Sequence, residues 1–194
     1  MKKRPIVFAA AVAALLTAAP AALFAMPRNV LEARNNAHDQ GLVAGAGLSD
    51  ARHVPTARNV ATMEARAEIA RELQVVVDAW QRLETAAFQG VGLGGRCEWT
   101  EVMFHSITET VARAAFPGSR SIYEYRAADG HYWVVVTISR AQAESTVANA
   151  AANAEAAAEA NPSVTRPSNF ERGRLANDEA QRRMREAFEL RFGN

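Results

Sequence analysis

The chain is poor in cysteine and lysine, and these shortages limit how the fold is stabilised and which partners it binds. A single cysteine, Cys97, stands among 194 residues, so an intramolecular disulfide is excluded and packing must stabilise the fold. The only lysines are Lys2 and Lys3, so every later cation is an arginine. Removing residues 1–25, which carry three cations and no acids, changes the formal net charge from +1 to −2. A near-neutral chain lacks the clustered basic residues that nucleic acids attract, so we predict no nucleic-acid partner.

The basic residues of the chain's start are followed by an apolar run. Lys2, Lys3 and Arg4 precede the run, which extends over 6–16, and the small residue Ala25 follows. This order is typical of a secretory signal peptide. We therefore predict a signal peptide over 1–25 and an exported protein, located in the periplasm or cell envelope after cleavage near Ala25.

An uncleaved membrane anchor is the competing interpretation of the same segment. Residues 6–25 are 20 in number, which is just enough for a helix to cross a bilayer. Thr17 and the helix-breaking Pro20 argue against an anchor. No cysteine lies near the predicted cleavage site, so no lipid anchor is predicted either.

The composition along the mature chain predicts one domain with a helical tail. We expect a flexible lead-in over 26–40, because this segment is polar and rich in Asn and Arg. An α+β domain is expected over 41–160, and a C-terminal linker and amphipathic helix over 161–194. The predicted fold class is α+β, with a small antiparallel sheet of about three strands and a long amphipathic helix packed on it.

Three segments have the pattern of strands. The glycine-broken apolar run 41–47 predicts a first strand whose small residues let a helix pack closely on one face. The runs 121–126 and 131–138 are rich in aromatic and β-branched residues, and 127–130 between them ends in Asp-Gly. This combination predicts a β-hairpin. The continuous apolar stretch 134–136 predicts that the second of these strands lies inside the sheet.

The clearest helix is predicted over 57–83, after Pro55 and the candidate cap Thr56. Apolar residues recur at three- and four-residue steps and predict a buried face. We expect that face to contain Val60, Met63, Ala67, Ala70, Leu73 and Val77, widened by Ile69, Val76 and Trp80. The small residues Ala61, Ala65, Ala67 and Ala70 keep much of it thin, which suits close approach of the helix to a sheet. Charges of both signs from Glu64 to Glu72, including Glu68, are interpreted as a solvated outer face.

Three more helices follow from the same kind of pattern. One is expected over 100–116, with Val102, Met103, Ile107, Val111 and Ala115 as candidate core positions. An Ala-rich helix is expected to begin at Ser139 or Arg140 and to continue to about Ala160. Its only bulky apolar residue is Val147, so we expect it to be mostly exposed and weakly packed. A last amphipathic helix is expected to end near Phe192.

Several of these segments, in this order, resemble a known family. The run Gly41-Leu-Val-Ala-Gly-Ala-Gly precedes Ala-Arg-Ala-Glu-Ile-Ala-Arg-Glu-Leu73, and Gly130-His-Tyr-Trp-Val-Val-Val-Thr-Ile-Ser139 follows. The set resembles the bacterial LPP lipoprotein family and the related N-terminal domain of flagellar assembly protein T. That resemblance implies a small α+β envelope domain used as an assembly or interaction module. The chain lacks the acylated cysteine of the lipoproteins, so lipid anchoring is not carried over.

Residues able to carry chemistry form no coherent set in the sequence. Cys97 with His105 or His131 and a nearby acid is conceivable as a thiol hydrolase, but no local signature surrounds the cysteine. The histidines show no metal-ligand spacing. The tryptophans, which are able to stack on sugars, are better explained as core residues. We therefore predict no catalytic residue, no metal and no cofactor.

Two functional hypotheses from different classes remain. The favoured one is a non-enzymatic cell-envelope protein that acts as an assembly or interaction module, with other envelope proteins or a second copy of itself as partners. Its candidate surfaces are the edge strand near Tyr123 and Tyr125 and the tail helix near Met184, Phe188 and Leu190. The alternative is an exported hydrolase of peptide or glycan bonds that uses Cys97.

Overall fold

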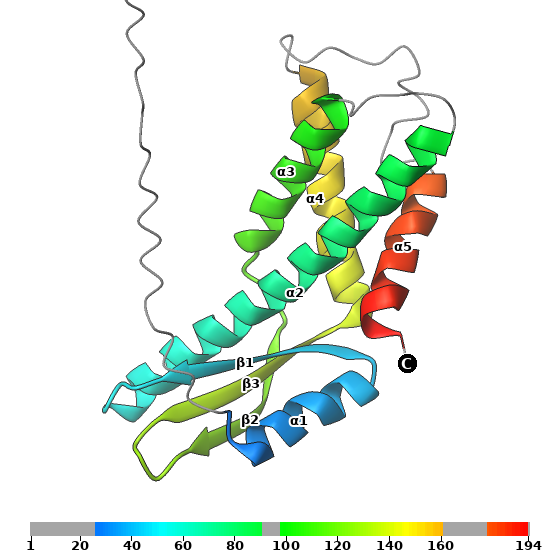
Figure 1. Ribbon diagram of the computed structural model, residues 1–194. Coiled ribbons are helices and arrows are strands. Elements are labelled where there is room, and N and C mark those ends of the chain that lie inside the picture. Colours follow the sequence, from blue (N-terminus) through cyan, green and yellow to red (C-terminus); the bar gives the residue numbers. More distant parts are fainter. Residues whose placement is uncertain (1–25, 91–97, 161–177, 194) are drawn as a thin grey trace, which may run out of the picture.

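A computed structural model of the chain describes residues 26–90, 98–160 and 178–193 (Figure 1). The predicted signal peptide, Cys97 and most of the predicted linker lie outside the described residues. The rest is an α+β fold, as predicted: a three-stranded sheet is covered on its two faces by helices, and a group of helices continues from one side of it. Within the described residues, no helix combines the length and apolar character needed to cross a membrane.

The sheet consists of β1 (Leu42–Ser49), β2 (Arg120–Arg126) and β3 (Tyr132–Ser139) in the order β1-β3-β2. Both pairings are antiparallel, with Ala46 opposite Val135 and Glu124 opposite Val134. The central strand β3 is buried from Tyr132 to Ile138, as its continuous apolar run predicted. All three strands lie within two residues of their predicted bounds.

The turn between β2 and β3 is the predicted Asp-Gly hairpin. The Ala127 N–H donates to the His131 carbonyl at 2.8 Å, and Gly130 has a φ of +94°. Asp129 accepts a hydrogen bond from the His131 N–H. A three-residue hairpin loop requires a left-handed backbone conformation at this position, and glycine adopts that conformation without a steric penalty.

Helix α2 (Val54–Gly90) covers one face of the sheet and extends well beyond it (Figure 1). Its closest approach to β1 is at Gly45 and Gly47, where a Cβ atom would lie 2.2 Å from the Ala65 carbonyl oxygen and 1.8 Å from that of Ala61. The prediction that small residues in the first strand admit a close helix is confirmed. The predicted stripe is wrong in the first turns, where Val60 and Met63 are 40% and 67% exposed.

Helix α1 (Arg28–Asp39) packs on the opposite face of the sheet (Figure 1). The prediction of a flexible lead-in over 26–40 is therefore wrong for this segment. Val30 and Ala37 are buried with Trp133 and Val135 of β3 in a cluster of their own. The sequence of α1 offers only a narrow apolar face, and the large side chains that make the contact favourable come from the sheet.

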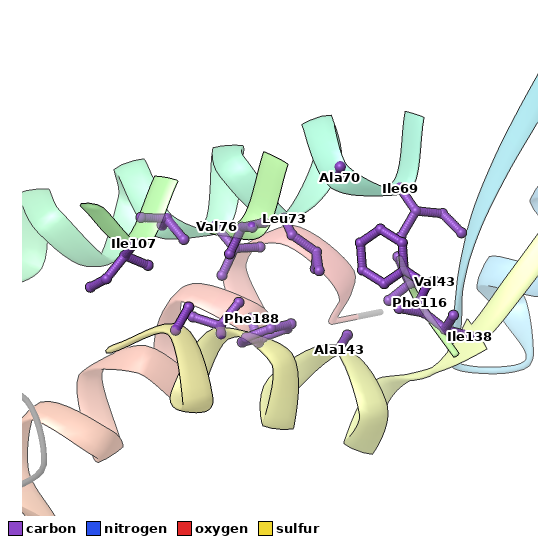
Figure 2. Packing of buried hydrophobic residues seen from close by; sticks show 14 of the residues in the cluster. Val43, Ile69, Ala70, Leu73, Val76, Ile107, Phe116, Ile138, Ala143 and Phe188 are labelled. Atoms are coloured by element: carbon purple, nitrogen blue, oxygen red, sulfur yellow. The ribbon is translucent and has the colours of Figure 1, made fainter. Parts of the chain in front are cut away.

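The far half of α2 packs with three helices, α3 (Glu98–Ala112), α4 (Arg140–Ala160) and α5 (Asp178–Phe192). Figure 2 shows the shared core, in which Val76, Ile107 and Phe188 from different helices meet. The prediction that the Ala-rich helix is mostly exposed is wrong, because one face of α4 is buried: Ala143, Val147, Ala150, Ala151, Ala154, Glu155 and Ala158. Alanines bury little area each, but they let α4 approach its neighbours closely.

Helix α3 contributes the predicted core residues Met103, Ile107 and Val111 to that core. Phe104, which was not predicted, is buried with them. Val102 is 39% exposed and Ala115 is exposed, so these two predicted core positions are wrong. Phe104 packs edge-on against Trp80 with ring centroids 5.1 Å apart. Phe104 was not predicted, because it directly follows Met103 and the core positions were assigned at three- and four-residue steps.

Candidate interaction surface

The two outer edges of the sheet differ in how their backbone groups are satisfied. At the β1 edge, the Ala46 N–H donates to Glu68 Oε2 of α2 at 2.5 Å. The other oxygen, Oε1, accepts from Arg34 of α1 at 2.7 Å. Helices from both faces of the sheet thus meet around this edge. An ion pair that occupies the middle of the strand and binds one of its outward N–H groups makes the β1 edge a poor template for another strand.

Among the described residues, nothing covers the β2 edge in this way. The hydrogen bond from Ala127 to His131 fixes the alternation of the antiparallel ladder, so the backbone groups of Glu124 and Arg126 point away from β3. No described residue forms a hydrogen bond with these outward groups. The side chains along β2 are exposed except for Tyr123 and Tyr125, which are half-buried. We name Arg120–Arg126 and its outward backbone the β2 edge.

On the face of the sheet toward α2, Glu124 is held by two close neighbours and accepts a longer hydrogen bond from the Ser121 hydroxyl at 3.5 Å. The Tyr132 hydroxyl donates to Glu124 Oε2 at 2.5 Å, and Arg58 of α2 donates to the same oxygen at 2.6 Å. The hydrogen bond from Tyr132, and then that from Arg58, hold the pKa of Glu124 below its usual range. The pKa of Tyr132 is raised, first by its hydrogen bond to Glu124. The β2 edge therefore presents a fixed, ionised carboxylate.

On the opposite face, the two predicted surface tyrosines lie against α1. Tyr123 and Tyr125 pack against the cluster that contains Val30 and Trp133. The Tyr123 hydroxyl also accepts a hydrogen bond from Asn29 Nδ2 at 2.9 Å. These tyrosines are anchored by their inner sides and leave their outer sides accessible along the edge.

The tail helix is not the free amphipathic surface that was predicted. Met184 and Phe188 are buried in the main core, and α5 packs along α2. Leu190 alone of the three predicted tail residues is exposed, at 71%. The apolar stripe of α5 is thus used inside the chain, and Met184 and Phe188 are corrected from surface to core positions.

A buried ion pair fastens α5 to α2. Arg183 contacts both carboxylate oxygens of Glu84 at 2.9 Å, and the Trp80 indole N–H donates to Glu84 at 3.1 Å. The Glu84 side chain is 1% exposed. Three donors on one buried carboxylate are what such a charge needs in order to be tolerated.

The two histidines considered for hydrolysis lie apart in the structure, and Cys97 lies outside the described residues. His105 is on the exposed side of α3, 3.7 Å from Glu109, whereas His131 lies at the β2–β3 turn, in the other half of the molecule (Figure 1). Within the described residues, no group of three potential ligands is arranged for a metal ion.

A shallow hollow lies beside the hairpin turn. It is lined by Asp50, Arg52, Arg126, Asp129, Gly130 and His131. The Asp129 carboxylate is 2.9 Å from His131 Nδ1, and the hydrogen bonds from His131 hold the pKa of Asp129 below its usual range. The hollow has about 200 Å³ of space, less than the roughly 300–1,000 Å³ of a typical ligand pocket. Its mixed charges give no preference for one ligand class.

Trp80 and Trp133 are core residues. Trp80 is fully buried and Trp133 is 6% exposed, so neither presents a ring to a sugar. The side chain of Trp99 lies outside the description.

Sequence reasoning missed the structural roles of two carboxylates. Glu68 was assigned to a solvated face, yet it accepts from the Ala46 N–H at the β1 edge. Glu84 was given no role, yet it pairs with Arg183 and fastens α5 to α2. Locally, Glu68 does not differ from Glu64 one turn earlier. Only the position of β1 beside α2 distinguishes them, and periodicity does not encode it.

The fold defines an α+β protein with a three-stranded antiparallel sheet between helices. Comparison of the chain with known protein families, with curated proteins and with solved structures gives no match.

Proposed function

We propose that this is an exported bacterial cell-envelope protein that acts as a non-enzymatic interaction module through the β2 edge. The observation that carries the proposal is the contrast between the two sheet edges. At the β1 edge, Glu68 accepts from the Ala46 N–H and pairs with Arg34, whereas the outward backbone of Glu124 and Arg126 has no partner among the described residues. Natural sheets cover or blunt their edges, so an edge left uncovered is a site for strand addition.

Export is supported by the sequence alone. The basic start, apolar run and Ala25 have the order of a signal peptide. The resemblance to the LPP lipoprotein family and to the N-terminal domain of flagellar assembly protein T supports a role in the envelope. The absence of a cysteine near the cleavage site supports release from the membrane without a lipid anchor.

Export is tested by expressing the full chain in a Gram-negative host and measuring the intact mass of the fractionated protein. We expect a periplasmic or envelope species that begins after Ala25. A full-length cytoplasmic species would overturn this part of the proposal.

The interaction is tested with two matched variants. Ile122 on β2 and Met63 on α2 are both exposed apolar residues, at 46% and 67%. Ile122→Lys places a charge on the β2 edge, which opposes strand addition, and Met63→Lys places the same charge elsewhere. After mild crosslinking in intact cells, we expect Ile122→Lys to lose the protein's stoichiometric partner and Met63→Lys to keep it. Equal capture by both variants would overturn the role of the β2 edge.

A further inference from the structure

We infer that the partner of the β2 edge is a second copy of this chain, joined by antiparallel pairing of β2 with β2 across a twofold axis at Tyr125. The inference rests on the proposed function and names the occupant of the same edge. It follows from the order of three consecutive residues, Glu124, Tyr125 and Arg126.

The backbone permits this register directly. In an antiparallel pair, a residue whose backbone N–H and C=O point toward the partner strand must lie opposite a residue whose backbone groups point back toward it. The backbone groups of Glu124 and Arg126 both point outward. With the twofold axis at Tyr125, Glu124 of one copy therefore lies opposite Arg126 of the other copy, and this pair occurs twice. Tyr125 then lies opposite its own copy as a non-hydrogen-bonded pair. The two sheets become one six-stranded sheet.

The charges select the same register. Glu124 and Arg126 lie on the same face of β2, so each carboxylate meets a guanidinium directly across the new pair, twice by symmetry. A shift that places Glu124 opposite Glu124, or Arg126 opposite Arg126, sets like charges against each other. Arg126 forms no ion pair with any described residue and is available for this contact. Glu124 keeps acceptor capacity beyond its bonds to Tyr132, Arg58 and Ser121.

Two further features fit pairing centred on Tyr125. The ladder between β2 and β3 is irregular between Ser121 and Tyr123, so Ile122 interrupts regular pairing at the other end of the strand. The aromatic ring of Tyr125 is already anchored against the cluster beneath α1. Two such rings across an axis form a cross-strand aromatic pair, a favourable kind of contact in sheets.

The register is tested by disulfide formation. In a Cys97→Ser background, Tyr125→Cys places a thiol opposite its own copy, and the roughly 4.5 Å between Cα atoms of a non-hydrogen-bonded pair allows a disulfide. We expect a crosslinked dimer on mild oxidation. Ile122→Cys, on the same exposed strand, is not opposite itself and should stay uncrosslinked. Crosslinking of Ile122→Cys instead of Tyr125→Cys would overturn the register.

Charge reversal provides a second test that does not depend on thiols. Glu124→Arg alone and Arg126→Glu alone each set like charges opposite each other and should weaken self-association by about tenfold or more, measured by sedimentation. Mixing the two variants restores both charge pairs, so a heterodimer should form at wild-type strength. Arg185→Glu, which reverses an exposed arginine on α5, should leave self-association unchanged. Failure of the mixture to associate would overturn the inference.

The two proposals fail differently. A purified protein that remains monomeric, with Ile122→Lys still losing an envelope partner that Met63→Lys retains, removes self-pairing and leaves the β2 edge as an interaction site. A monomer whose capture is indifferent to both substitutions removes both proposals.

Discussion

Gly47 of β1 lies against the backbone of Ala61 of α2, so closely that a Cβ atom on the glycine would stand 1.8 Å from the Ala61 carbonyl oxygen. No real side chain tolerates such a contact, and the obstructing atom belongs to a helix backbone that is unable to rotate away. The separation between the long helix and the sheet is therefore set by the absence of a side chain at this position.

The first prediction follows from this contact. Gly47→Ala should destabilise the protein by about 1–3 kcal/mol or more, the usual cost of overpacking a core, as measured by urea denaturation. Ala61→Gly in the same chain should give no rescue, because the clash is with the carbonyl group and not with the methyl group. Recovery of stability in the double variant would show that side-chain crowding is the cause instead.

A second prediction concerns the ion pair between Glu84 and Arg183. Arg183→Met leaves the buried Glu84 carboxylate without its cation and should cost about 3–5 kcal/mol of unfolding free energy. The double variant Glu84→Leu/Arg183→Met should recover most of this loss, since it removes both charges. Arg182→Met provides the matched control, because the Arg182 side chain is 61% exposed and should have a near-zero effect. A single variant as stable as the wild type would contradict the role of the pair.

The third prediction is a pH dependence that originates at His38. Burial, followed by the charge of Arg34, holds the pKa of His38 below its usual value of 6.5. The fold therefore favours the neutral ring, which stacks on Phe192 of α5 at 6.2 Å between centroids. Because the folded pKa is the lower one, this stability is present above pH 6.5 and is lost as the pH falls from there through the folded pKa.

Other charges near His38 act on the same ring. Glu72 opposes the shift, and Arg191, which pairs with Glu72, reinforces it. His38→Phe keeps a ring against Phe192 and should flatten the dependence of unfolding free energy on pH between about 7.5 and 5.5. His105→Phe, at an exposed position on α3, should keep the wild-type dependence. Identical slopes for both variants would assign the effect to another group.

The fourth prediction tests the hydrogen bond between Glu68 and the Ala46 N–H at the β1 edge. Glu68→Ala removes the acceptor of the Ala46 N–H, so exchange of the Ala46 amide with deuterium should accelerate by about tenfold or more. Glu68→Gln keeps an acceptor oxygen and should lie between the alanine variant and the wild type. Glu64→Ala, one turn away on the exposed face, should leave the Ala46 amide protected. An unchanged Ala46 rate in Glu68→Ala would show that the edge is covered by another contact.

The sheet and its order of elements follow from the sequence to a large extent. Gly130 in an Asp-Gly turn and the continuous apolar run of β3 are local signals, and the strand bounds derived from them are correct to within two residues. The contact between the long helix and the sheet was also predicted in part, since Ala61 and Ala65 of the thin helix face are the residues that lie against Gly47 and Gly45. The same local logic fails at Met63, which was assigned to the buried face but is 67% exposed.

The candidate site was only partly predictable for a related reason. An amphipathic pattern shows that Phe188 needs a partner, but it does not show whether the partner lies in the same chain or in another. The edge character of β2 was predicted, because the continuous apolar run 134–136 indicated that β3 lies inside the sheet. At the opposite edge, the N–H of Ala46 on β1 is bound by Glu68, which lies on α2. A contact between two separate elements is not encoded in the pattern of either one.

The docking of α5 has a consequence for how the protein reaches its folded state. Met184 and Phe188 belong to the same buried cluster as Ile69 and Val43, so the main core stays open until the last helix is available to fill it. Under the export that we propose, α5 is the last of the described elements to cross the membrane. The core is then completed only after α5 has passed.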